Sequence, residues 1–270
     1  MTETFASPHG TEAQGQHVTR DAFLGGAVML LQPARGYRAG IDAVFLGAAA
    51  QPKAGCDRLT VLDAGAGVGT AGLLAAKRLG KRADVRVTLV EREPELVALA
   101  ERNARENGLG HSTRVVAGDF LAPAADLEAL GVARDSFDIV LANPPYHEQQ
   151  RGTLSADPLK AGANAMEAGD LERWVRAMAR HTRAGGEAIV VHKADALGEL
   201  LAAFAPRFGG VRILPLYPRQ GEAASRVIVA GTKGSRAPLK LLAGLVLHGQ
   251  GNDFTPEAAA ILRHGEGLWS

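Results

Sequence analysis

The segment Asn143-Pro144-Pro145-Tyr146 contains the residue types that point most directly to chemistry. Two consecutive prolines fix the backbone and remove two N–H donors, so the turn offers two acceptors, the side-chain oxygen of Asn143 and the carbonyl of Pro144. Tyr146 adds a flat stacking surface. Two acceptors that grip a planar NH2 group favour a pyramidal nitrogen with an exposed lone pair. The turn is therefore typical of a site that alkylates an amide or exocyclic amino nitrogen.

A second candidate site is the glycine-rich turn formed by Gly65, Gly67 and Gly69 between an apolar run and an Ala/Leu-rich segment. Glycines let a backbone approach a ligand closely, and the free N–H groups of the following helix lie beside that ligand. The spacing is G-x-G-x-G, which differs from the G-x-G-x-x-G of dinucleotide-binding proteins. By itself the pattern also fits a plain strand-to-helix turn.

Three acids, Asp63, Glu91 and Asp119, end three successive strand-like runs. The carboxyl ends of parallel strands meet at one edge of a sheet, where ligands of such folds bind. Glu91, as an acid at the solvent edge, is suited to accept hydrogen bonds from a ribose diol. Asp119 and the following Phe120 are suited to an adenine, the acid through the amino group and the ring through stacking.

Short β-branched runs alternate with Ala/Leu-rich segments of helical period, which predicts βαβ units and an α/β fold. The predicted strands cover 59–64, 85–90, 113–116, 137–142, 187–192, 211–216 and 226–230, and the predicted helices 70–79, 93–107, 170–182 and 194–205. The last two runs are too close for a crossover helix, so they should form an antiparallel pair at one edge. A further strand-like run, 239–247, precedes a short helix that Thr255 caps with Pro256 at its first position.

These motifs resemble those of the class I S-adenosylmethionine-dependent methyltransferases, in particular the Asn-Pro-Pro-Tyr group. The chain is also similar to the bacterial tRNA (adenine-N6)-methyltransferases in segments 23–26, 31–33, 36–46, 245–248 and 253–258. The described member of that family modifies the adenine beside the anticodon of a valine tRNA, at nucleotide position 37. The resemblance implies a Rossmann-like fold. It has a seven-stranded, mainly parallel sheet with an antiparallel edge pair and helices on both faces.

The resemblance also implies roles for individual residues, with S-adenosylmethionine as the cofactor. Gly65 and Gly67 pass under its methionine part, with Asp63 near the amino group. Glu91 holds the ribose, and Asp119 with Phe120 the adenine. Arg38 and Asp42 close over the cofactor or target, although they also fit a surface pair at a helix start. The target base is gripped by the catalytic residues Asn143, Pro144 and Tyr146, and Asn143 also borders the cofactor.

Composition narrows the class of protein further. The 270 residues are 46% hydrophobic and 22% charged, as in an ordinary globular protein, and we expect a loose tail over 1–20 followed by one domain over 21–270. The single cysteine, Cys56, fits a reducing compartment, and no apolar run is long enough to span a membrane, so we expect a cytoplasmic location. Scattered histidines give no metal spacing, so we expect no metal. Residues 151–240 carry 14 Lys/Arg against 8 Asp/Glu, a balance of +6 that fits either a solvated face or contacts to RNA phosphates. The RNA partner that we expect is a tRNA.

Alternative functions share some of these features. Methylation of a guanine amino group in ribosomal RNA, or of a protein glutamine amide, would use the same tetrapeptide. Glutamine methyltransferases of this group carry a helical domain before the glycine turn, and the residues before position 59 hold no multi-helix pattern. A nicotinamide oxidoreductase is favoured by Glu91 alone, and a silent cofactor-binding or RNA-binding module is the remaining alternative.

Overall fold

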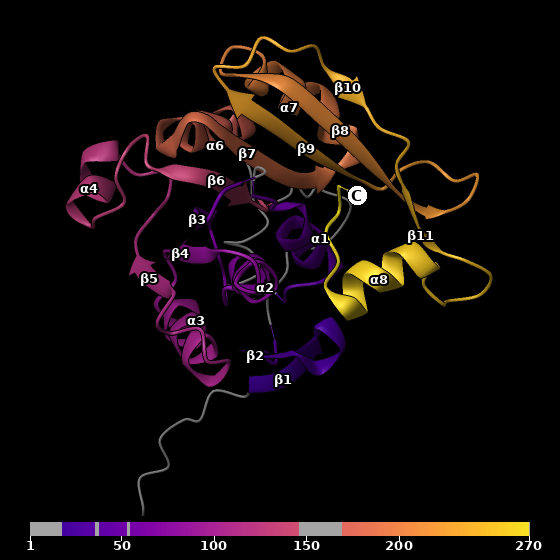
Figure 1. Ribbon diagram of the computed structural model, residues 1–270, viewed down its shortest axis with the longest axis horizontal. Helices are drawn as coiled ribbons and strands as arrows, with labels where there is room; N and C mark the ends of the chain where they lie inside the picture. The colour runs from indigo at the N-terminus through magenta and orange to yellow at the C-terminus, as the bar shows by residue number, and fades with distance from the viewer. Residues whose placement is uncertain (1–17, 36–37, 53–54, 146–168, 270) are drawn as a thin grey trace, which may run out of the picture.

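The computed structural model describes residues 18–35, 38–52, 55–145 and 169–269 (Figure 1). The strands are β1 (Val18–Phe23), β2 (Val28–Pro33), β3 (Arg58–Ala64), β4 (Asp84–Glu91), β5 (Thr113–Ala117), β6 (Phe137–Ala142), β7 (Thr182–Lys193), β8 (Phe208–Arg219), β9 (Arg226–Lys233), β10 (Lys240–Leu241) and β11 (Leu245–His248). The helices are η1 (Leu24–Gly26), α1 (Ile41–Ala49), α2 (Thr70–Leu79), α3 (Pro94–Glu106), α4 (Ala124–Ala129), α6 (Asp170–His181), η2 (Ala194–Ala196), α7 (Leu197–Phe204) and α8 (Pro256–His264). The predicted tail falls outside the described residues up to position 17, and its last three residues begin β1.

The main sheet has the strand order β10-β8-β9-β7-β6-β3-β4-β5, with β11 also paired to β8. All seven predicted strands are present as β3 to β9, and β9 runs antiparallel to β8, as predicted. It also runs antiparallel to β7, a pairing that the sequence analysis did not predict. Two short strands, β10 and β11, extend the sheet beyond β8, so the antiparallel pair lies next to the edge. The predicted run 239–247 is divided into β10 and β11, because Gly244 between them has a φ of +82°, which is not extended backbone. A side chain at this position would collide with the ring of Tyr217, so glycine is required there.

Helices cover both faces of this sheet, as predicted (Figure 1). One apolar core joins the sheet to α1, α2, α3 and α8, and a second core joins the other face to α4, α6 and α7. The predicted cap of α8 is confirmed, because the Thr255 hydroxyl accepts the N–H of Ala258 and Pro256 occupies the first turn. None of the described helices is long and apolar enough to cross a membrane.

The chain reverses its direction of travel across the sheet at β3. Strands β4 and β5 follow on one side of β3, whereas β6 and β7 lie on the other. Ala64, the last residue of β3, pairs with Val90 of β4 and with Ala142 of β6. Ligands of open parallel sheets bind outside the carboxyl ends of the strands at such a switch point. The glycine-rich turn and the Asn-Pro-Pro turn therefore leave the sheet side by side.

The N-terminal hairpin of β1 and β2 attaches to α3 through side-chain amides. Asn103 is fully buried; its Oδ1 accepts the N–H of Leu31 at 2.7 Å, and its Nδ2 donates to the carbonyls of Leu31 and Val68 at 3.0 Å. In the same way, Asn107 accepts the N–H of Met29 with its Oδ1 and donates its Nδ2 to the carbonyl of Met29. Both amides pair with β2 as a neighbouring strand would, and Asn103 also ties the glycine-rich turn to the hairpin.

We expect Asn103→Ala to lower the free energy of unfolding by at least about 2 kcal/mol, because it leaves three buried backbone groups without partners. Asn107→Ala is the matched control, since Asn107 is only half-buried and water can replace part of its contacts. Urea denaturation of both variants measures the difference. An equal or smaller loss for Asn103→Ala would show that this amide does not hold the hairpin.

Candidate active site

The glycine-rich turn is held by backbone contacts to the end of β4. Gly65, Gly67 and Gly69 all have positive φ, at +63°, +59° and +88°. The N–H of Ala66 donates to the carbonyl of Val90 at 2.9 Å, next to the last residue of that strand. The turn is therefore fixed against its neighbouring strand before the helix α2 begins.

Internal packing accounts for part of the glycine requirement that the sequence suggested for ligand approach. A side chain at Gly65 would lie 2.8 Å from the ring of Trp174 on α6, and one at Gly69 would lie 2.8 Å from Leu89. Trp174 is buried, and no local pattern links it to this turn, because 105 or more residues separate the two. The turn thus rests on α6 below and on β4 at its side.

Glu91 is the residue that joins the turn to β4 through its side chain. Its Oε2 accepts the N–H of Gly67 at 2.7 Å, and its Oε1 accepts the N–H groups of Arg92 and Glu93 at 2.8 and 3.0 Å. Glu91 is only 7% exposed, so the expectation of an acid at the solvent edge is wrong: the three N–H groups draw the carboxylate inward. A carboxylate has about four acceptor positions, so one remains for a ligand hydroxyl.

Asp63 lies behind the turn and is 3% exposed. Its Oδ2 accepts the N–H of Gly72 in the first turn of α2 at 2.7 Å. Burial raises the pKa of Asp63 to about 7; the hydrogen bond from Gly72 opposes that rise and the charge of Glu91 adds to it. A cationic group placed near this carboxylate would lower its pKa again, so the residue fits a positively charged ligand.

Asp119 and Phe120 follow β5 and point in different directions. Asp119 is exposed, and its Oδ1 accepts the N–H of Leu121 at 2.9 Å. Phe120 is 3% exposed, and its ring packs against Trp174 at 5.5 Å and His181 at 5.7 Å between ring centroids. The ring therefore belongs to the core in this structure, which leaves the carboxylate as the part of this pair that faces outward.

The Asn-Pro-Pro turn follows β6 directly, beside the glycine-rich turn. Asn143 is half-buried and Pro144 buried, whereas Tyr146 and the segment 151–165 lie outside the described residues. His192, near the end of the adjacent strand β7, is 2% exposed. Burial lowers the pKa of His192, and contacts of its ring with the backbone of Pro145 and Lys193 oppose that change. His192 therefore supports the turn from behind, a role that its place in the sequence did not reveal.

Arg38 and Asp42 do not pair with each other. Arg38 donates to Asp21 of the hairpin at 2.7 Å, and the same Asp21 oxygen accepts from Gln32 at 2.8 Å. Asp42, in the first turn of α1, pairs with Arg226 at 2.9 Å. Arg226 lies opposite Lys193, the last residue of β7, so this second pair stands at the same sheet edge as the two turns.

The predicted basic surface is only partly described. Within it, Arg219 donates to the carbonyls of Gly249 and Gly251 and thereby orders a loop, and Arg226 is engaged with Asp42. Arg151 and Lys160 fall outside the described residues. Among the residues that are described, no three His, Cys, Asp or Glu side chains gather where they could hold a metal ion.

Comparison with known proteins identifies the class. Residues 57–207 match the family described as a methyltransferase domain, and this match covers more than half of the chain. The chain therefore belongs to the methyltransferase domain family. This confirms the resemblance to the S-adenosylmethionine-dependent methyltransferases that the motifs suggested, with S-adenosylmethionine as the cofactor.

Individual relatives show which methyltransferases the chain resembles, and over how much of its length. The chain is 25% identical over 217 residues to a tRNA1(Val) (adenine(37)-N6)-methyltransferase from Actinobacillus pleuropneumoniae, a match to 79% of this chain and 84% of that enzyme. It is 34% identical over 91 residues to a release factor glutamine methyltransferase from Moorella thermoacetica, a match to 34% of this chain and only 28% of that enzyme. The chain spans less than half the length of two other relatives that are named tRNA1(Val) (adenine(37)-N6)-methyltransferase, from Enterobacter sp. and Escherichia coli.

A solved structure shows a similar fold over most of the chain. The "predicted O-methyltransferase, protein Atu636" from Agrobacterium tumefaciens superimposes with a TM-score of 0.68 and 29% identity, covering 84% of this chain and 98% of that one. The similarity therefore extends beyond the matched domain at 57–207.

We expect Glu91→Ala to weaken S-adenosylmethionine binding about ten-fold or more, because a hydrogen bond to a charged group contributes roughly 1.5–3 kcal/mol. The same change should also lower stability, since three backbone N–H groups lose their acceptor. Glu95→Ala, which removes an exposed acid nearby, is the control. Calorimetric titration measures the affinity, and equal affinities of the two variants would remove Glu91 from the cofactor site.

The raised pKa of Asp63 predicts a pH dependence of stability. Between the ordinary value of 3.8 and about 7, the folded protein retains a proton that the unfolded chain has released. The contribution of Asp63 to stability is therefore fully present below that ordinary value and is lost as the pH rises through about 7. Asp63→Asn should lack this loss, whereas the exposed control Asp119→Asn should keep it. Denaturation at pH 5 and pH 8 distinguishes them; the same pH slope in wild type and Asp63→Asn would contradict the assignment.

Proposed function

We propose that the protein transfers a methyl group from S-adenosylmethionine to the exocyclic amino nitrogen of an adenine in tRNA. The observation that carries the proposal is the pairing of Ala64 with Ala142, because it sets the glycine-rich turn and the Asn-Pro-Pro turn next to each other. The first turn fits the cofactor and the second fits a planar NH2 group. A tRNA substrate would imply a cytoplasmic enzyme.

The geometry and charge of the residues at the switch point fit S-adenosylmethionine. Glu91 keeps one acceptor position for a ribose hydroxyl, and Asp63 is a buried carboxyl whose ionisation a cationic ligand would favour. Gly65 and Gly67 bring the backbone close to the methionine part, and the exposed carboxylate of Asp119 can receive the adenine amino group. When bound, S-adenosylmethionine supplies a methyl group on a sulfonium that is already a good leaving group.

The catalytic task of the chain is to hold the target nitrogen in line with that methyl group. The side-chain oxygen of Asn143 and the carbonyl of Pro144 accept the two protons of the NH2 group and expose its lone pair. Placement at about 3–3.5 Å supplies the proximity contribution to catalysis. No strong base is needed before attack, because the nitrogen proton becomes acidic only after methylation. Tyr146 stacks on the base, which must leave its neighbours in the RNA to reach the site.

Adenine in tRNA is favoured over a protein glutamine by the extent of the similarity. The tRNA-modifying relative matches most of both chains, whereas the glutamine-modifying relative matches a third of this one. Arg38 and Asp42 belong to the N-terminal part of the chain, where their ion pairs to the hairpin and to β9 fit a structure that closes over the target.

We expect Asn143→Ala to slow single-turnover methylation of a tRNA transcript on the order of 100–1,000-fold, because one preorganised polar contact at the reacting nitrogen is lost. Its affinity for S-adenosylmethionine should change little. Tyr146→Ala should mainly weaken tRNA capture, by the stacking contribution of about 1–3 kcal/mol, and Tyr146→Phe should be mild. Near-normal turnover by Asn143→Ala would exclude the two-acceptor mechanism.

The substrate itself is tested by mass spectrometry of nucleosides and peptides from cells with and without the gene. We expect loss of N6-methyladenosine from one tRNA in the cells without the gene. Loss of a methylated guanine from ribosomal RNA, or of a methylated glutamine from a release factor, would overturn the tRNA assignment and identify the alternative.

A further inference from the structure

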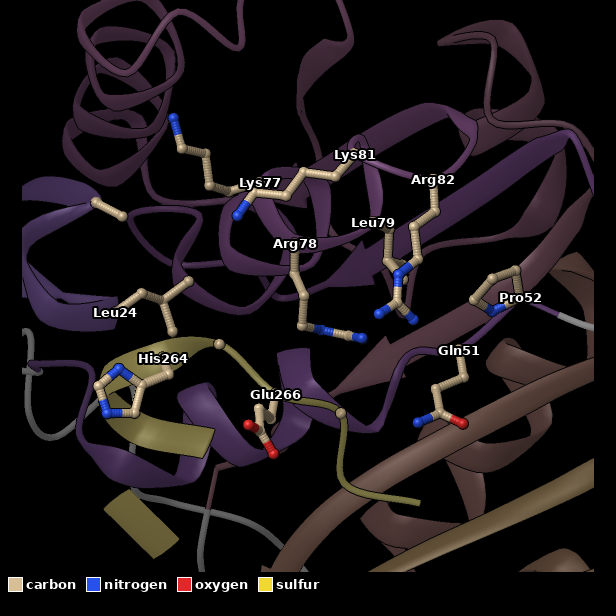
Figure 2. Close-up of a pocket in the computed structure, with 13 residues that line it drawn as sticks. Leu24, Gln51, Pro52, Lys77, Arg78, Leu79, Lys81, Arg82, His264 and Glu266 are labelled. Carbon is tan, nitrogen blue, oxygen red and sulfur yellow. The ribbon is translucent and has the colours of Figure 1, made fainter. Parts of the chain in front are cut away.

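A second concave site lies at the opposite end of α2 from the glycine-rich turn. The pocket has a volume of about 580 Å3 and is lined by the end of α2, the turn after it, residues 51–52 and the segment 264–267 (Figure 2). Because α2 starts beside the glycine-rich turn and spans ten residues, about 15 Å of helix separate its two ends. The pocket is therefore distinct from the proposed active site.

Positive charge is concentrated in this pocket. Lys77, Arg78, Lys81 and Arg82 all line it, and Glu266 is the one acid among the residues that do. Within the part of the chain that the structure describes, none of these four cations forms an ion pair, although many other arginines on the surface do. Figure 2 shows the guanidinium groups of Arg78 and Arg82 on the same side of the cavity, with Glu266 across from Arg78.

The hydrogen-bonding groups of Arg78 are only partly used by the surrounding structure. Its Nη2 donates to the carbonyls of Gly47 and Ala50 at the end of α1, and its Nε is buried without a partner among the described residues. Burial and the neighbouring charge of Arg82 lower the pKa of Arg78 to about 10, so it stays charged at neutral pH beside a like charge. An anion between the two guanidinium groups would offset that repulsion.

The negative ends of helix dipoles offset some but not all of the positive charge in the pocket. The carboxyl ends of α1 and α2 meet here, and each is equivalent to about half a negative charge. Together with Glu266 they balance about two of the four cations, which leaves a surplus of about +2. A phosphate monoester or a diphosphate carries a matching charge, and arginine forks suit phosphate oxygens in particular. The volume lies within the ordinary range for small-ligand sites.

We propose that this pocket binds a phosphate-bearing ligand, with Arg78 and Arg82 as the arginine fork and Lys77 and Lys81 as accompanying charges. The C-terminal segment fixes the wall that carries Glu266, because the N–H of Leu268 donates to Ala48 at 3.0 Å and the Trp269 indole donates to Ala49 at 2.6 Å. The phosphate can come from a free nucleotide or from an RNA backbone.

The test measures binding of inorganic pyrophosphate, of ATP and of a short RNA to the full-length protein. The double variant Lys81→Gln/Arg82→Gln removes two exposed cations and leaves the Arg78 contacts to α1 intact. Arg102→Gln/Arg105→Gln removes the same charge from the exposed face of α3, outside the pocket and outside residues 151–240, and serves as the control. We expect the pocket variant to weaken pyrophosphate binding at least ten-fold, the control to leave it unchanged, and Glu266→Gln to strengthen it. S-adenosylmethionine affinity should not change in any of them.

The RNA arm distinguishes the two sources of phosphate. Competition between RNA and pyrophosphate, with weaker RNA binding by the pocket variant, assigns the site to an RNA backbone. Unchanged RNA binding with weaker ATP binding assigns it to a free nucleotide. The proposal is overturned if wild-type protein binds neither pyrophosphate nor ATP saturably, or if the pocket variant and the control bind pyrophosphate equally while both keep the melting temperature of the wild type.

Discussion

The hydrogen bond from the N–H of Gly67 to the carboxylate of Glu91 is the contact on which the arrangement of this site depends. A turn of three glycines with positive φ has little conformational preference of its own, so neighbouring groups must hold its shape. Glu91 holds it from β4, and Asn103 holds the carbonyl of Val68 from α3. Both anchors are nearly or fully buried, which makes each bond stronger and its loss more costly.

Fixing the turn in this way also positions what lies around it. The hairpin of β1 and β2 attaches to the same Asn103, so this hairpin and the glycine-rich turn are held by one side chain. On the other side of β3, the Asn-Pro-Pro turn takes its place from strand register, with His192 behind it. The proposed chemistry requires a constant distance between the glycine-rich turn and the Asn-Pro-Pro turn. The adjacent parallel strands β3 and β6, which these turns follow, provide it.

Much of the fold was accessible from the sequence because its signals are local. The alternation of strand and helix patterns placed β3 to β9, and Thr255 with Pro256 marked the start of α8. Long-range contacts were not accessible. Nothing local showed that the Phe120 ring would face the core, that Glu91 would be drawn inward by three N–H groups, or that Arg38 and Asp42 would find separate partners in Asp21 and Arg226. The basic cluster at the end of α2 was not predictable from composition, because acids elsewhere in residues 51–150 balance its cations in the sequence but do not line the pocket.

A crystal structure of the complex with S-adenosylhomocysteine tests the organisation of the switch point most directly. We expect one ribose hydroxyl to donate to the free acceptor position of Glu91 while Gly67 keeps its bond to the same carboxylate. The adenine should lie beside Asp119, and the sulfur should face Asn143. A nucleoside bound away from Glu91, or a glycine-rich turn that has released Glu91, would contradict the claim that this carboxylate both shapes the turn and reads the cofactor.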